Sequence, residues 1–288
     1  MNESPKAPMS DKDFLQEAIH IVDQAEEFGV TIRILGALAI RMQTPHKIDL
    51  HRTLDRLGEG KMSFTDIDLI GPKAQRRKIE NFFEKGLGFV VDRYALLAAK
   101  DRYIYHHPEK PYYVDVFLDC LDFSHKIEFA HKKDFHRLSL DKPTITLADL
   151  VLEKTQIHDI NEKDIKDLIT LFAGHEVGTT DKDPKTINEA YIAEVLCNDW
   201  GFWYDATANL KKALDFCKKY CEEGLVEKSE SDAVVAKIEE LLKTIDEHPK
   251  TKNWEKRAKK GTSKQWWKDV EESDRGADQH TIKRNSWF

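Results

Sequence analysis

Two aspartates separated by one residue occur in the stretch TDIDL at residues 65–69. On a β-strand, side chains two residues apart face the same way, so Asp66 and Asp68 would present two carboxylates on one face. Two like charges this close raise the energy unless a cation lies between them. Hard divalent cations prefer carboxylate oxygens, so the spacing favours a magnesium site. A solvated sheet face or a turn is the alternative.

A glycine and a third aspartate add to this pattern. Gly36 follows a predicted strand, Ile-Arg-Ile-Leu at residues 32–35, and precedes a helical pattern. A glycine at a helix start lets the backbone approach a phosphate. Asp115 lies between Val114 and Val116, where a buried carboxylate needs a partner. Three carboxylates on adjacent strands beside a glycine-opened helix could hold two magnesium ions and align a nucleoside triphosphate (NTP) with an attacking hydroxyl.

This order of motifs resembles the nucleotidyltransferase superfamily of the DNA polymerase β type. Its members carry Gly-Gly or Gly-Ser at a helix start, then Asp-x-Asp on a strand, and a third aspartate on a later strand. Gly36 with Ala37, Asp66 with Asp68, and Asp115 stand in these positions. The chain departs from the family in two ways. Ala37 has no hydroxyl that could bind a phosphate, and the segment between Gly36 and Asp66 is longer than usual.

The closer resemblance is to the AbiEii-like branch, which includes toxins of toxin–antitoxin systems and many uncharacterised proteins. Its members carry a lysine on a helix after the sheet and a Lys-Asp-x-x-Asp type of segment on the next helix. Lys154 and the segment with Lys163, Asp164 and Asp167 look like these elements. The likeness covers roughly residues 30–175.

The resemblance implies a role for each of these residues. Asp66 and Asp68 would bind metal ions, Mg²⁺ or Mn²⁺, and Asp115 would complete a second metal site and help to deprotonate the acceptor. Lys154 would contact a phosphate or the leaving group, and Asp164 would orient Lys154 or bind a nucleotide hydroxyl. The nucleotide site as a whole would be lined by Gly36, Ala37, Thr65, Lys154 and Asp164.

The helix residues also have simpler interpretations. Lys154 and Asp164 are the kinds of charge that lie on an exposed helix surface. Asp167 stands four residues after Lys163, and such pairs form ordinary ion pairs on one helix face.

The expected function is therefore a metal-dependent nucleotidyltransferase. It would transfer NMP from an NTP to a hydroxyl acceptor on a tRNA, a protein or a small molecule, and would release pyrophosphate. By resemblance it is a toxin with a cognate antitoxin as partner. One alternative is a catalytically silent module that binds nucleotides or RNA with the same fold, which the alanine at position 37 motivates. Another is a phosphodiesterase or nuclease that uses the same metals.

The order of the elements predicts the fold class. Patterns of strands and helices up to residue 142, followed by helical patterns, indicate an α+β protein with a mixed sheet, flanking helices and an all-helical C-terminal half. The resemblance implies that the sheet is nucleotidyltransferase-like. The expected segments are a loose N-terminus at 1–10, an α/β core at 11–142, helices that complete the active site at 143–175, a helical domain at 186–248 and a basic Trp-containing tail at 249–288.

Local patterns place individual elements. Apolar spacing predicts helices at 11–28, 36–41, 72–85, 147–157, 161–173, 187–197, 204–222 and 230–247. Strands are expected at 30–35, 65–71, 88–92, 102–106, 112–119 and 126–130. Thr146 and Asp149 form a capping box at a helix start. Residues 44–63, with Pro45 and two glycines, are expected to be a long irregular connection, and residues 174–185 a linker.

Composition limits the class of protein. The net charge of −7 argues against a protein that is basic throughout and coats nucleic acid. No apolar run approaches the ~20 residues needed to span a bilayer, and the N-terminus has no apolar core of a signal peptide. The four cysteines are then expected to be reduced thiols in the cytoplasm, with no membrane partner.

Several other signals point to structure rather than to chemistry. His106, His107, His125 and His131 lack zinc-type spacing and are expected to be exposed loop residues. Cys217 and Cys221 are expected to be buried or half-buried thiols. The aromatic cluster at 200–204 is expected to be a joint between helices. Residues 250–268 are basic and contain three tryptophans, so they either contact RNA, dock their tryptophans on the body, or pair with the acidic stretch at 222–247.

Overall fold

A mixed five-stranded sheet forms the centre of the N-terminal part. The computed structural model describes residues 9–56, 64–98 and 101–270. The strand order is β1-β2-β5-β4-β3, with β2 and β5 parallel and the other neighbours antiparallel. This confirms the predicted α+β class. The strands are β1 (Arg33–Ile34), β2 (Asp66–Gly71), β3 (Val90–Val91), β4 (Arg102–His106) and β5 (Tyr113–Leu118).

The two central strands show why the aspartates lie where they do. In β2, Ile67 and Leu69 are fully buried, whereas Asp66 and Asp68 are half-buried on the opposite face. The predicted separation of the two faces is thus confirmed. The parallel register sets Asp68 beside Asp115 of β5, so the aspartates of both strands lie on the same side of the sheet.

The first helices pack against this sheet. Helix α1 (Asp11–Glu27) begins with a capping box between Ser10 and Asp13, and α2 (Gly36–Gln43) begins at the glycine that the sequence singled out. The expectation of an irregular connection at 44–63 is wrong for its described part. It forms a 3₁₀ turn, η1 (Pro45–Lys47), and α3 (Ile48–Leu54), because Leu50 and Leu54 recur one helical turn apart and are buried. Residues 57–63 lie outside the described ranges.

The rest of the N-terminal part contains elements that were predicted and elements that were missed. The helix after β2 is present as three consecutive helical segments. The short helix before β4 and the first strand of a hairpin after β5 were not predicted. These elements are η2 (Lys73–Gln75), α4 (Arg76–Asn81), the π-helical η3 (Phe82–Gly86), α5 (Arg93–Ala98), β6 (Cys120–Asp122), β7 (Lys126–Glu128) and η4 (His136–Ser139).

Helices dominate the C-terminal half, as predicted. Thr146 caps α6, because its side chain accepts a hydrogen bond from the Asp149 N–H. The expected linker departs from the prediction, since it contains one strand of a two-stranded parallel sheet. The elements are α6 (Leu147–Thr155), α7 (Glu162–Gly174), β8 (Glu176–Gly178), β9 (Thr186–Asn188), α8 (Glu189–Leu196), α9 (Trp200–Glu222), α10 (Lys228–Glu247), α11 (Lys252–Ala258) and η5 (Gly261–Ser263).

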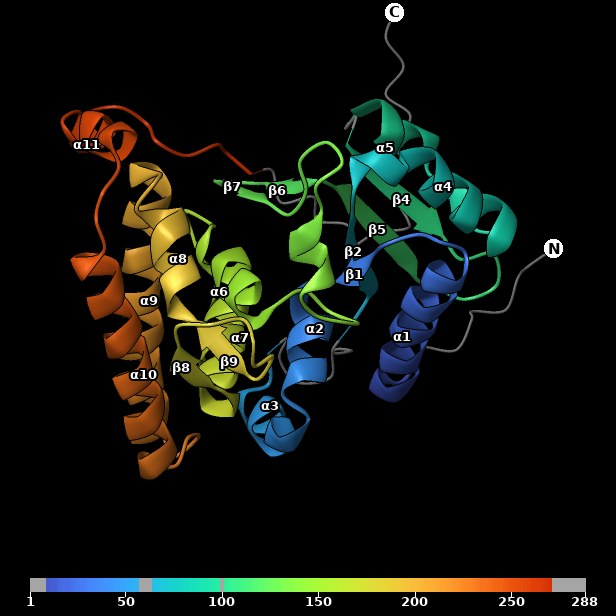
Figure 1. The fold of residues 1–288 in the computed structure, drawn as a ribbon. Helices are drawn as coiled ribbons and strands as arrows, with labels where there is room; N and C mark the ends of the chain where they lie inside the picture. Colours follow the sequence, from blue (N-terminus) through green and yellow to red (C-terminus); the bar gives the residue numbers. More distant parts are fainter. Residues whose placement is uncertain (1–8, 57–63, 99–100, 271–288) are drawn as a thin grey trace, which may run out of the picture.

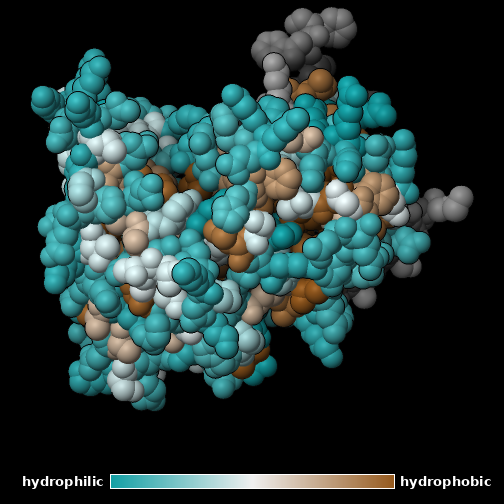
Figure 2. All heavy atoms as spheres, viewed as in Figure 1, coloured by the Kyte–Doolittle hydropathy of each residue, from teal (hydrophilic) through white to brown (hydrophobic). Residues whose placement is uncertain are grey.

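The two halves meet along α2, α6 and α7. Figure 1 shows the sheet on the right, helices α8, α9 and α10 on the left, and these three helices between them. A backbone bridge between Ile34 and Thr144 ties β1 to the segment that leads into α6. The face in Figure 2 is mostly hydrophilic, with hydrophobic atoms in separate patches. Among the described residues, no helix is both long enough and apolar enough to cross a bilayer.

The end of the described chain returns to the sheet. The C-terminal strap, residues 264–268, runs from η5 to the β6–β7 hairpin, where the Lys268 N–H donates to Ser124 O at 3.0 Å (Figure 1). Trp266 Nε1 donates to Asp205 Oδ1 at 3.0 Å, and Trp267 stacks on His158 with ring centres 3.7 Å apart. The strap therefore joins α9, the α6–α7 loop and the hairpin.

Two predictions about this region have clear outcomes. The prediction that His125 is exposed is wrong, because its side chain is buried and its Nε2 lies 2.7 Å from Asp205 Oδ2. The docking of the tail tryptophans is confirmed for the described residues, since Trp254 also contacts Trp203 with ring centres 5.1 Å apart. Among the described ion pairs, none joins the basic stretch at 250–268 to the acidic stretch at 222–247.

Replacing Trp266 by alanine should loosen the strap and destabilise the fold by about 2 kcal/mol. The half-buried ring would lose its packing, and Asp205 would lose one of its donors. The midpoint of urea unfolding should fall, and trypsin should cleave the strap lysines faster. Trp266→Phe keeps an aromatic ring but not the N–H, so its unfolding midpoint should lie between those of wild type and Trp266→Ala. An unchanged midpoint for Trp266→Ala would show that the strap does not stabilise the fold.

Candidate active site

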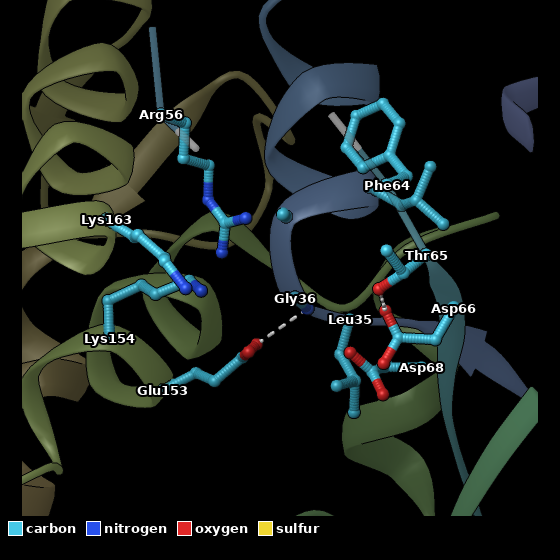
Figure 3. Close-up of a pocket in the computed structure, with 12 residues that line it drawn as sticks. Leu35, Gly36, Arg56, Phe64, Thr65, Asp66, Asp68, Glu153, Lys154 and Lys163 are labelled. Atoms are coloured by element: carbon cyan, nitrogen blue, oxygen red, sulfur yellow. Dashed lines mark hydrogen bonds between the residues drawn. The ribbon is translucent and has the colours of Figure 1, made fainter. Parts of the chain in front are cut away.

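One pocket of about 210 Å³ lies where the start of α2 meets β2, α6 and α7. Figure 3 shows Asp66 and Asp68 on one wall, Arg56, Lys154 and Lys163 on the opposite wall, and Gly36 between them. The pocket thus places negative charge across from positive charge over a helix start. Its full lining is Leu35, Gly36, Ala37, Leu38, Arg56, Phe64, Thr65, Asp66, Asp68, Glu153, Lys154 and Lys163.

Gly36 is required at its position for two reasons. Its backbone φ of +73° lies in the left-handed region, which residues other than glycine rarely adopt. A Cβ atom placed there would lie 3.0 Å from Asp68 Oδ2, closer than ordinary contact allows. The preceding Leu35 N–H donates to Asp68 O at 3.0 Å. The start of α2 is therefore held directly against the aspartate pair.

Asp66 and Asp68 differ in how their charges are compensated. Asp66 accepts hydrogen bonds from the Thr65 hydroxyl at 3.1 Å and from the Tyr113 hydroxyl at 2.8 Å. No hydrogen-bond donor within the described ranges reaches the Asp68 carboxylate. Burial and the negative charges of Asp66 and Asp115 raise the pKa of Asp68 well above its usual value. Asp68 is thus a carboxylate short of positive charge.

Glu153 belongs to the pocket and was missed from the sequence. The Gly36 N–H donates to Glu153 Oε2 at 3.0 Å, so a carboxylate of the chain occupies the anion-binding position at the start of α2 (Figure 3). Burial raises the pKa of Glu153 to about 7, although the neighbouring Lys154 opposes this shift. In the sequence, the one distinguishing feature of Glu153 is that it stands directly before Lys154. An exposed glutamate on any helix could have the same neighbour, so this position does not indicate a role in a pocket.

Asp115 is not part of the pocket lining, although it lies beside Asp68 in the sheet. Its side chain is buried, and Arg102 Nε donates to both carboxylate oxygens at 2.9 Å. Arg102 Nη2 also donates to Asp115 Oδ2. The buried aspartate therefore has the partner that the sequence required. Within the described residues, no group of three or more His, Cys, Asp or Glu side chains is arranged to hold a metal ion.

Lys154 is the centre of a buried ionic network. The amino group donates to Asp164 Oδ1 at 2.9 Å and lies 3.1 Å from Asp167 Oδ2, and Arg56 Nε donates to Asp167 Oδ2 at 2.9 Å. Lys154 is only 6% exposed, so the simpler interpretation as a surface lysine is wrong. The expected contact between Asp164 and Lys154 is present, and its catalytic role stays a prediction. Asp167 pairs across helices rather than with Lys163, because it lies on the buried face of α7.

Lys163 is the basic residue of the pocket that keeps its charge available. It is exposed on the first turn of α7 and forms no hydrogen bond or ion pair within the part of the chain that the structure describes. Figure 3 shows Lys163 on the same side of the pocket as Lys154, and both residues belong to its lining. Lys163 is therefore an exposed lining cation that is open to an anionic ligand.

Replacing Glu153 by glutamine should stabilise the protein at pH 8 and change little at pH 5. An acid with a higher pKa in the folded state destabilises the fold progressively as pH rises from its unfolded value, 4.5, to its folded value, about 7. The gain at pH 8 should reach up to about 3 kcal/mol. Urea unfolding in EDTA at both pH values measures it. Glu128→Gln, an exposed control, should change stability little at either pH. If Glu153→Gln changed the stability equally at pH 5 and at pH 8, the raised pKa of Glu153 would be refuted.

Comparisons with known proteins name no family for this chain. No protein-family model matches it, and no curated protein gives a significant match. Among solved structures, the antibiotic-resistance factor ANT(2'')-Ia is similar over 56% of this chain and 83% of its own, with 16% sequence identity and a TM-score of 0.33. A similarity with so low a TM-score does not support a shared function. The function is therefore inferred from the residues of the pocket.

Proposed function

We propose that this chain is a metal-dependent nucleotidyltransferase that transfers NMP from an NTP to a hydroxyl acceptor and releases pyrophosphate. The observation that carries the proposal is the pocket in which Asp66 and Asp68 face Lys154 and Lys163 across the start of α2. An NTP with a divalent ion has the complementary pattern, with the ion facing carboxylates and the phosphate oxygens facing cations.

The donors in the pocket fit a divalent cation. Asp66 and Asp68 offer hard carboxylate oxygens, and no donor among the described residues satisfies the Asp68 carboxylate. These two residues would hold Mg²⁺ or Mn²⁺. Bound there, the ion would offset the charge of the triphosphate and make its α-phosphorus more electrophilic.

The chain's own residues would bind and orient the nucleotide. Lys163 would contact phosphate oxygens, and Lys154, held by Asp164, would stabilise charge on the departing pyrophosphate. Glu153 must leave the Gly36 N–H before a phosphate oxygen can accept from it, and its pKa near 7 makes this release accessible at neutral pH. The acceptor oxygen then bonds to the α-phosphorus as the bond to pyrophosphate breaks. The acceptor's proton passes to a carboxylate oxygen.

The biological setting of this activity is part of the proposal. The resemblance to the AbiEii-like branch supports a toxin that acts in the cytoplasm and is neutralised by a cognate antitoxin. The acceptor would be a hydroxyl of a tRNA, a protein or a small molecule. Induced expression should then arrest growth, and an Asp66→Asn/Asp68→Asn variant should not.

An acceptor screen tests the proposed function. The purified chain is incubated with each of four α-labelled NTPs, Mg²⁺, and total tRNA, lysate protein or a small-molecule extract. Label should move into one acceptor pool, should depend on Mg²⁺, and should be lost in the Asp66→Asn/Asp68→Asn variant. No transfer to any pool with any NTP would count against the proposal. If the variant transferred as much label as wild type, Asp66 and Asp68 would have no role in the reaction.

A second candidate is a catalytically silent module that binds a nucleotide or RNA. Two observations favour it: Glu153 already occupies the anion-binding position at Gly36, and Arg102 covers both oxygens of Asp115. Such a module would bind an NTP in equilibrium dialysis and transfer nothing. Binding without transfer in the same screen would favour this candidate over the enzyme.

A further inference from the structure

The ion pair between Arg102 and Asp115 has a bearing on how many metal ions the site can hold. Asp115 lies in register with Asp68 on the neighbouring strand, where a second metal site would need it. Both of its oxygens accept hydrogen bonds from Arg102 Nε at 2.9 Å, and one also accepts from Nη2. Three hydrogen bonds from one guanidinium take up most of the roughly four lone-pair positions of this carboxylate, which leaves little to coordinate an ion in the pocket.

The position of Arg102 is fixed by the sheet. The residue begins β4 and pairs in register with Phe117 of β5, two residues beyond Asp115. Its guanidinium lies over the Phe117 ring, 5.0 Å from the ring centre, while Asp115 is 2% exposed. An arginine is permanently charged, and its planar fork matches a carboxylate. The strand register therefore places the Arg102 side chain, which is 35% exposed, beside the buried Asp115.

The charges near Asp68 divide accordingly. Asp66 is bound by the Thr65 and Tyr113 hydroxyls, which carry no charge, and Asp68 has no donor among the described residues. Asp115 faces a full positive charge at hydrogen-bond distance. Among the described residues, a cation thus lies at hydrogen-bond distance from the third carboxylate, and none does so from the first two.

We propose that Arg102 takes the place of one of the two metal ions, so that the site holds a single divalent cation at Asp66 and Asp68. This inference rests on the proposed function. Arg102 would be a positioning residue, which holds Asp115 turned away from the nucleotide. Asp115 would then shape the charge at Asp68 without binding a metal.

Electron paramagnetic resonance of bound Mn²⁺ tests this directly, because two ions about 3.5–4 Å apart are spin-coupled and a single ion is not. The purified chain is loaded with Mn²⁺ and an NTP analogue with a non-hydrolysable α,β bridge. Wild type should give the six-line spectrum of an isolated ion and bind one protein-dependent Mn²⁺ per chain. Arg102→Gln should bind a second ion and give a coupled spectrum.

Three further variants separate the possible outcomes. Arg102→Lys keeps the charge and should bind one ion, and circular dichroism checks that each variant is folded. Arg76→Gln removes an arginine of helix α4 that pairs with Glu80 and is not part of the pocket lining, and should also bind one ion. Asp66→Asn/Asp68→Asn should bind none.

Each deviation has a distinct meaning. A coupled pair in wild type would overturn the inference and leave the proposed function standing. A single ion in folded Arg102→Gln would show that Arg102 does not exclude the second one, and would overturn the inference as well. No protein-dependent Mn²⁺ in wild type would instead overturn the metal-dependent function on which the inference rests.

Discussion

Replacing both Asp66 and Asp68 by asparagine is expected to lower the rate of nucleotide transfer by at least about a thousandfold. Asparagine keeps the shape of each side chain and removes the two charges that would hold the divalent cation. Losing the charge stabilisation that a metal gives costs several kcal/mol of activation free energy, and about 4 kcal/mol corresponds to a factor of a thousand. Initial rates with saturating NTP and Mg²⁺ measure the effect.

Stability and a distant control show whether the loss is chemical. The double variant should be at least as stable as wild type in EDTA, because crowded negative charge is removed from around Asp68. Asp122→Asn, which alters an exposed carboxylate on the β6–β7 hairpin, should keep the full rate. A double variant that keeps a tenth of the wild-type rate would remove these aspartates from the mechanism.

Replacing Asp167 by asparagine is expected to destabilise the fold by about 3–5 kcal/mol. Asp167 is 2% exposed and neutralises both the buried Lys154 and the half-buried Arg56, so its loss leaves these two cations without their shared counter-charge. Burial alone would raise the pKa of Asp167, but Lys154 and Arg56 hold it below its usual value. The free energy of urea unfolding at pH 7 measures the cost.

The pH dependence of this variant gives a second, independent readout. A carboxylate with a lowered pKa in the folded state stabilises the fold above its unfolded pKa of 3.8 and loses that effect as pH falls through the folded value. The gap between wild type and Asp167→Asn should therefore persist at pH 5 and close below pH 3.8. Lys163→Ala, an exposed change on the same helix, should alter stability by less than about 0.5 kcal/mol and weaken NTP binding. If Asp167→Asn cost no more stability than Lys163→Ala, the ionic network around Lys154 would not stabilise the fold as described.

The sheet and the aspartate pair could be predicted because their signals are local. In β2, Asp66, Ile67, Asp68 and Leu69 alternate in polarity, and that alternation alone fixes which side chains share a face. The start of α6 was equally clear, because the capping interaction of Thr146 involves a residue only three positions away.

The partners that define the pocket could not be predicted, because they are distant in sequence. Glu153 meets Gly36 across 117 positions, and Arg56 meets Asp167 across 111. Arg102 reaches Asp115 only through the antiparallel register of β4 and β5. In each case the residue type is ordinary for its element, and only the fold shows that its charge is buried or paired. The missed helix α3 differs, because the charges around its two buried leucines concealed a short apolar spacing.

The central claim is that this pocket transfers a nucleotide, and the fate of the two ends of the NTP tests it most directly. The chain is incubated with Mg²⁺, an acceptor pool, and the same NTP labelled at either the α- or the γ-phosphate. A nucleotidyltransferase places the α-label on the acceptor and releases the γ-label as pyrophosphate, in equal amounts. The account would be contradicted if no α-label were transferred and the γ-label instead appeared as inorganic phosphate or became attached to the acceptor.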